Sequence, residues 1–182
     1  EIQQEAADKD ILFRCDDGSG SITTYFFLDG SNSHTNFQLN ARWVDNAWAE
    51  FGNSGDFDIY HDGSNSFLEN NRGDLSIVNY VNDSDIIFRS DDGSGGVATY
   101  MTVDGSATKV TLQKDLRADD GVKIQAGSSG DLFMVHESDT GKITNGTGNL
   151  EIIQNTDDGD IIFKSDDGSG SITTYFFLDG SN

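Results

Sequence analysis

The sequence predicts an all-β fold in the form of a repetitive, elongated β-fibre, and three observations support this. Short runs of Ile, Val, Phe, Tyr and Thr are separated by Asp-Gly and Gly-Ser pairs, a pattern typical of strands joined by tight turns. The periodic Leu, Ala, Glu and Lys of long core helices are scarce, and only 35% of the 182 residues are apolar. The chain also repeats itself, which predicts a repeat architecture.

The repeat is 75 residues long. Asp10–Ser31 recurs as Asp85–Ser106 and again as Asp160–Ser181, and the two intervening segments align without a gap. We therefore expect three parts, namely the end of one repeat (1–31), a full repeat (32–106) and a second full repeat (107–181).

Each repeat is expected to contain about six short strands. In the last repeat these are Lys109–Lys114, Val122–Ala126, Asp131–His136, Leu150–Gln154, Asp160–Lys164 and Ile172–Leu178. The final two form a hairpin around Asp-Asp-Gly-Ser-Gly, because glycine adopts positive φ and Asp bonds to its own turn backbone. Alternation along the last strand places one set of side chains on a single face: Ile172, Thr174, Phe176 and Leu178.

Strands this short do not bury enough apolar surface to be stable alone. Two arrangements supply the missing burial. Three chains can intertwine as a homotrimer, resembling a triple β-helix or β-prism, or one chain can coil as a β-solenoid. We favour the homotrimer, because the strands vary in length, no regular coil period is visible, and a threefold assembly removes free strand edges.

Charge and motifs exclude several classes of function. The formal net charge of −21 predicts no binding to nucleic acid, because an acidic surface repels phosphate. No apolar stretch approaches the length of a membrane span, so no membrane insertion is expected. Ser/His/Asp, GxSxG, phosphate-loop and CxxC motifs are all missing, and we predict that the protein is not an enzyme.

Two histidines are candidate metal ligands. His61 and His136 occupy equivalent positions, each in alternation with apolar residues, so three copies on a threefold axis could hold a metal ion. The alternative is a histidine bonded to a backbone group at a strand end, and we favour it. A divalent cation at the Asp-rich turns is possible, but we predict no cofactor, because turn chemistry explains these aspartates.

Three aromatic residues are candidate sugar-binding groups. Trp43 and Trp48 occur only in the first full repeat, and with Tyr60 they could form a platform that stacks on a sugar ring. The alternative, which we favour, is that the tryptophans cover a locally wider core.

Two motifs carry a family resemblance, Asp56–Asn70 and Asp85–Ser106. They resemble repeats in tail-fibre and related virion structural proteins of marine, cyanophage-like bacteriophages. The resemblance implies a homotrimeric fibre shaft, outside the cell on a virion, that positions a receptor-binding tip for host attachment. Its implied partners are further copies of itself, other virion tail proteins and a host-surface glycan. The alternatives are a carbohydrate-binding or adhesive module and an adhesin or surface-layer repeat of a cell.

Overall fold

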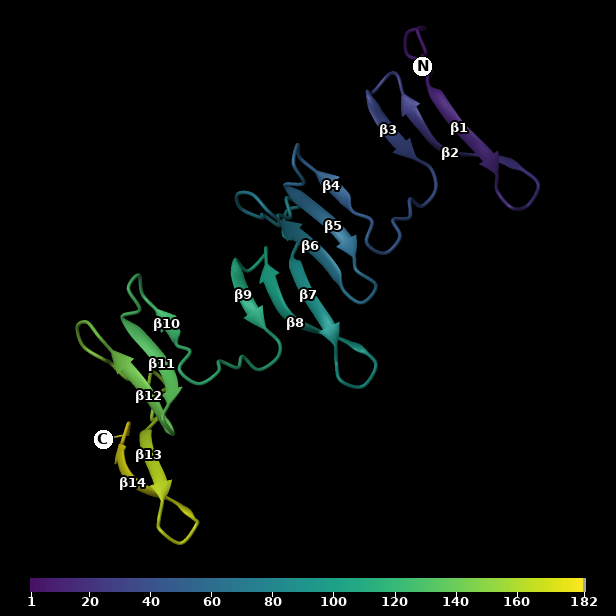
Figure 1. The fold of residues 1–182 in the computed structure, drawn as a ribbon. Helices are drawn as coiled ribbons and strands as arrows, with labels where there is room; N and C mark the ends of the chain where they lie inside the picture. Colours follow the sequence, from purple (N-terminus) through teal and green to yellow (C-terminus); the bar gives the residue numbers. More distant parts are fainter. Residues whose placement is uncertain (182) are drawn as a thin grey trace. The chain divides into compact units, whose positions relative to one another are not determined.

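The computed structural model describes residues 1–181 and is built from strands and turns alone (Figure 1). The all-β prediction is confirmed. Nothing in these residues forms a helix of the length and apolar character needed to cross a membrane. The chain divides into two compact units, Glu1–Val78 and Asn79–Asn182, which are described separately.

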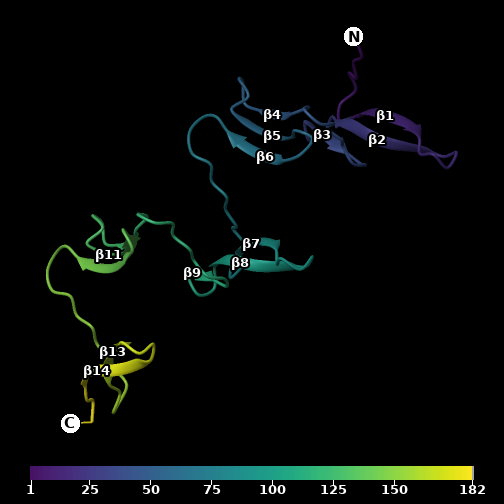
Figure 2. The same cartoon turned by 60° about the horizontal axis from the view of Figure 1, so that its bottom comes forward.

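The first unit contains two antiparallel sheets of three strands each, with each strand hydrogen-bonded to its neighbour in sequence (Figures 1 and 2). Sheet I consists of β1 (Ile11–Asp16), β2 (Ile22–Asp29) and β3 (His34–Phe37). Sheet II consists of β4 (Ala49–Phe51), β5 (Phe57–His61) and β6 (Ser66–Asn70).

The second unit contains three sheets that follow the same order. Sheet III consists of β7 (Ile86–Asp91), β8 (Val97–Asp104) and β9 (Lys109–Leu112). Sheet IV consists of β10 (Ile124–Ala126), β11 (Leu132–Glu137) and β12 (Thr140–Asn145). Sheet V has two strands, β13 (Ile161–Asp166) and β14 (Ile172–Leu178). Sheets I, III and V begin 75 residues apart, as do sheets II and IV.

In sheets I, III and V, the first two strands form a hairpin closed by the Asp-Asp-Gly-Ser-Gly turn. Between β1 and β2, the Asp16 carboxylate accepts from the Gly18 N–H at 2.8 Å, and the Asp17 carboxylate accepts from the Ser19 hydroxyl at 2.6 Å. The Tyr25 hydroxyl donates to the Asp16 carbonyl at 3.0 Å. The same bonds recur between β7 and β8 and between β13 and β14. Gly18 and Gly20 both have φ of 86°, which explains the need for glycine there.

A β-bulge interrupts this hairpin and corrects the predicted alternation. In sheet V, Phe163 lies opposite Phe176 while the next residue, Lys164, lies opposite Thr174. Neighbouring residues on β13 point to opposite faces, so Thr174 and Phe176 do not share a face as predicted. Sheets I and III shift register at the equivalent place.

Five of the six strands predicted for the last repeat are present, Ile172–Leu178 with the predicted ends and the other four with shifted ends, and one is wrong. Leu150–Gln154 forms no strand, and its apolar side chains are exposed, because no neighbouring segment pairs with its backbone. A strand that was not predicted, β12, pairs with β11 instead. Its two-residue turn, Ser138–Asp139, has positive φ at both positions (50° and 60°), as a type I′ hairpin requires.

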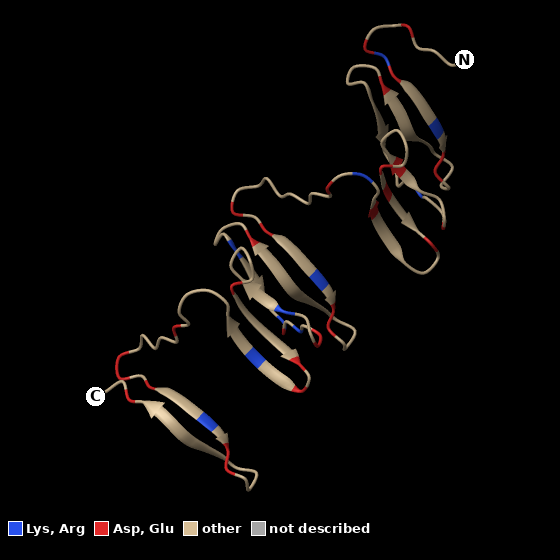
Figure 3. Ribbon diagram, turned by 60° about the vertical axis from the view of Figure 1, so that its left-hand side comes forward, with Lys and Arg blue, Asp and Glu red and all other residues tan. Residues whose placement is uncertain are grey.

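Very little of this chain is buried. Within residues 1–181 the one buried apolar residue is Val135, and the buried polar residues are Asp58 and Thr102. Large apolar side chains instead lie in rows across the strands, such as exposed Phe88 and Leu112 on either side of half-buried Met101 in sheet III. Asp and Glu lie mostly in the turns and at strand ends (Figure 3). Each three-stranded sheet therefore presents apolar rows without a covering layer from its own strands.

Candidate functional site

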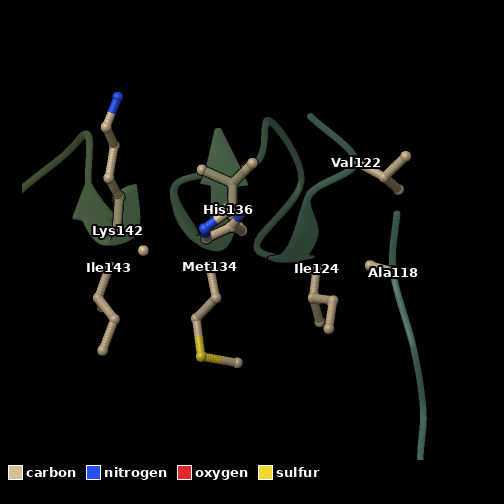
Figure 4. A pocket seen from close by; sticks show the side chains of 9 residues that line it. Ala118, Val122, Ile124, Met134, His136, Lys142 and Ile143 are labelled. Carbon is tan, nitrogen blue, oxygen red and sulfur yellow. The ribbon is translucent and has the colours of Figure 1, made fainter. Parts of the chain in front are cut away.

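An apolar hollow of about 490 Å³ lies on one face of sheet IV. Ile124, Met134 and Ile143 lie directly opposite one another on β10, β11 and β12. Their side chains extend side by side from the same face, with Ala118 beside them, whereas Lys142 points to the opposite side (Figure 4). We call this surface of Ile124, Met134 and Ile143 the apolar face of sheet IV.

The same hollow occurs on sheet II, with a volume of about 440 Å³. All nine of its lining residues lie 75 positions before those of the hollow on sheet IV. Ala49, Ile59 and Leu68 form the cross-strand row, and Trp43 takes the place of Ala118. The hollow is therefore a property of the repeat. Its apolar lining suits an apolar protein surface better than a small charged ligand.

A histidine that lines each hollow is paired with an aspartate. His61 Nδ1 lies 3.1 Å from Asp45 Oδ1, and the equivalent His136 Nδ1 lies 3.0 Å from Asp120 Oδ1. The backbone strengthens this link, because the N–H groups of Asn46 and Gly121 donate to the carbonyls of His61 and His136, both at 2.8 Å. The pair ties the segment that precedes β4 or β10 to the end of the central strand.

The proton on the imidazole decides which contact of His61 is a hydrogen bond. The Gly63 N–H also points at His61 Nδ1, at 3.0 Å, but one nitrogen cannot donate to Asp45 and accept from Gly63 at once. The carboxylate contact is the one that His136 repeats, so we assign Nδ1–H as the donor in both copies.

The two histidines predicted as metal candidates are thus both paired with carboxylates. The described part of the chain contains no group of three His, Cys, Asp or Glu side chains that could hold a metal ion. That the three copies of His61, or the three copies of His136, meet on a threefold axis remains a prediction. Sequence reasoning missed the partners Asp45 and Asp120, although their 75-residue spacing, the same as that of the histidines, was a usable signal.

The structure brings two of the three predicted sugar-platform residues together. Trp48 stacks on Tyr60 with ring centroids 4.4 Å apart, and Tyr60 stacks on Phe67 at 4.7 Å. Trp48 directly precedes β4 and Phe67 lies on β6, the strands on either side of β5, so both faces of the Tyr60 ring are covered. Trp43 lines the hollow with Ile59, whose side chain alternates to the other face of β5.

Carboxylates lie close to the stacked rings of Trp48, Tyr60 and Phe67. The Tyr60 hydroxyl donates to Glu69 at 2.9 Å, and this bond raises the pKa of Tyr60. Asp58, between Glu50 and Glu69 in register, is 1% exposed. One of its oxygens accepts from Asn71 at 3.1 Å, and the other meets no donor within residues 1–181. The second repeat has Phe133 in place of Asp58, so this carboxylate is peculiar to the first.

The chain was also compared with known proteins. No protein-family model, no curated protein and no solved structure matches it.

Proposed function

We propose that this chain is a shaft segment of a bacteriophage tail fibre or a similar virion appendage, assembled as a homotrimer through its apolar sheet faces. Its role is structural rather than catalytic, and it holds a receptor-binding tip away from the particle. Its other partners are virion tail proteins and, through the tip, a host-surface glycan. The observation that carries the proposal is the uncovered apolar surface on each three-stranded sheet, repeated every 75 residues.

The amount of exposed surface supports a partner of this kind. The chain exposes 14851 Å², whereas a compact monomer of 19.7 kDa exposes about 8,600 Å² by the usual scaling. Large apolar side chains contribute to this surface, for example Ile143 at 66% and Leu68 at 63% exposure. At about 25 cal/mol per Å², covering such residues is a large driving force for association.

A threefold arrangement suits the observed faces. Sheets II and IV each have one apolar face with the cross-strand row at its centre, and three such faces around an axis enclose a core to which every chain contributes equally. Acidic residues lie mostly in turns and at strand ends, away from these rows (Figure 3). The alternative of a single-chain solenoid would cover the faces by successive coils of one chain.

Light scattering on two variants of equal charge tests the proposal. Wild type should have the mass of three chains. Ile143→Asp places a carboxylate on the apolar face of sheet IV and should shift the mass to one chain. Gln125→Asp is the control, because Gln125 lies opposite Phe133 on the other face, and it should leave the trimer intact. A wild-type monomer with native strand content would overturn the trimer and favour the solenoid.

A further inference from the structure

Two segments that link successive sheets leave their apolar side chains uncovered. They are Leu75–Val78, which follows β6, and Leu150–Ile153, which follows β12, and they occupy equivalent places in the 75-residue repeat. Neither pairs with a strand within residues 1–181. Ile77 is 60% exposed, and its counterpart Ile152 is 64% exposed. We call these two segments the apolar connectors.

Side-chain amides fix the chain at both ends of a connector. Before it, Asn145 donates from its side chain to the Gly148 carbonyl at 3.1 Å, and the counterpart bond runs from Asn70 to Gly73 at 2.8 Å. After it, the Gln154 side chain accepts a backbone N–H at 2.9 Å and so caps the next turn. The same turns therefore lead both connectors away from the strands that precede them.

The repeat shows which face of a connector is apolar in every copy. The position of Ile152 is isoleucine in all three copies, whereas the position of Ile153 is occupied by Gln3 in the first copy. Neighbouring residues of an extended segment point to opposite faces. Leu150 and Ile152 therefore share the face that is always apolar, and Glu151 shares the other face with Ile153.

Charge makes the connectors the places where copies of this chain repel one another least. Residues 75–82 contain no Asp, Glu, Lys or Arg, in a chain of which 24% is charged and whose net charge is −21. In the second connector the one charged residue, Glu151, lies on the face opposite Ile152. Short segments of high β propensity and low charge, without proline, associate readily with their own copies. The occupant that fits a connector is therefore the same connector of another copy.

We propose that the apolar connectors are contacts between chains, an inference that rests on the homotrimer proposed above. Three copies of each connector run side by side in register around the threefold axis. Ile77 in one connector and Ile152 in the other point to the axis and meet their own counterparts, whereas Ile153 points to solvent. Cyclic symmetry brings identical residues together in this way. The contact covers apolar side chains that lie outside the sheets.

Chemical cross-linking of two single-cysteine variants tests this contact. Both carry Cys15→Ser, which places there the residue type of Ser90 and Ser165, so that each chain has one thiol. With a short three-armed maleimide, Ile152→Cys should join three chains in one covalent product, because the three thiols face one axis. Ile153→Cys is the matched control, an adjacent isoleucine on the other face, and it should react without joining chains.

Light scattering on the unlinked variants separates this inference from the proposed function. A trimeric mass without a linked product from Ile152→Cys, or with equal linking of both variants, overturns the connector contact and leaves the shaft proposal standing. A monomeric wild type overturns the shaft proposal and the connector contact with it. The pair Ile77→Cys and Val78→Cys repeats the measurement in the other connector, so that misfolding of one variant does not decide the result.

Discussion

The turn aspartates show the same chemistry at each repeated turn. Asp17, Asp92 and Asp167 each accept from the hydroxyl and the backbone N–H of the serine two positions later, and these bonds lower the pKa of all three carboxyls. An ionised carboxylate is the better acceptor, so these turns are held most firmly when the aspartates are charged.

Asp29 is the strongest case and gives a prediction. The Ser31 hydroxyl and the Asn32 amide donate to its carboxylate and lower the pKa of Asp29 from 3.8 to about 2. Because the folded value lies below the ordinary one, this group stabilises the fold above about pH 4, and its contribution is lost as the pH falls through about 2.

Ser31→Ala should move the pKa of Asp29 back toward 3.8, as followed by carboxyl-carbon NMR during an acid titration. Asp104, the equivalent residue of the next repeat, serves as the internal control and should titrate as in the wild type. An unchanged Asp29 would show that Asn32 and the backbone alone set its pKa.

The turn bonds could be predicted from sequence, whereas for the histidine pairs the 75-residue spacing marks Asp45 and Asp120 as repeated residues without placing them beside His61 and His136. Asp and Ser within three residues of each other interact locally, and the pattern Asp-Asp-Gly-Ser-Gly is sufficient to show it. Asp45 and His61 are 16 residues apart, so their contact depends on how the segment before β4 folds back on β5. That path is set by positive φ at Asn46 (63°), which the residue type permits but does not require.

Among the elements, β12 is a strand that its sequence predicts only weakly. Its residues, Thr-Gly-Lys-Ile-Thr-Asn, contain one large apolar side chain and give a weak strand signal. The segment Leu150–Gln154 has stronger β propensity and yet pairs with nothing in the described residues. Pairing is decided by the adjacent turn, because Ser138–Asp139 brings β12 back onto β11 directly.

This turn also offers a stabilising change. Ser138 and Asp139 adopt the φ values of a type I′ turn, for which Asn-Gly is the preferred pair. The double variant Ser138→Asn, Asp139→Gly should stabilise sheet IV by roughly 0.5–1 kcal/mol, measured as slower amide exchange in β11 and β12. As a control, Ser94→Asn creates the same Asn-Gly pair before Gly95, in a five-residue turn of another type, and it should not stabilise sheet III. Faster exchange in sheet IV would show that the side chains now present contribute more than the φ preference.

At the scale of the whole chain, charge and apolar surface act against each other. A net charge of −21 in every copy opposes association, while the exposed apolar faces favour it. Salt screens the repulsion between the charged copies and leaves the attraction between their apolar faces, since the Debye length falls from about 30 Å at 0.01 M to about 8 Å at 0.15 M.

We therefore expect trimer formation to strengthen as salt is raised over this range, measured as the midpoint of association in light scattering across a protein dilution series. The Ile143→Asp variant should stay monomeric throughout and controls for nonspecific salting-out. Weaker association at high salt would indicate an interface held by ion pairs instead of apolar contact.

The fold class and the period followed from composition and repetition, whereas the division into sheets did not. The predicted boundary after residue 31 falls between β2 and β3, which pair within one sheet. A period can be read from any starting point, and the place where one sheet ends and the next begins depends on pairing between Phe26 and Phe37. The number of chains in the proposed assembly depends on contacts between chains, which the pattern of one chain indicates only through its uncovered apolar faces.

Within residues 1–181, each strand pairs only with strands that precede or follow it directly in the chain. A gene encoding such a protein can gain or lose a 75-residue unit by recombination between the copies of its repeated hairpin segment without separating a strand from its partner. The length of the protein is thereby free to vary between lineages while the local folding problem stays the same. Selection can therefore change the length of the protein in fixed steps of one repeat. An insertion into a core in which distant segments interlock would instead require compensating substitutions.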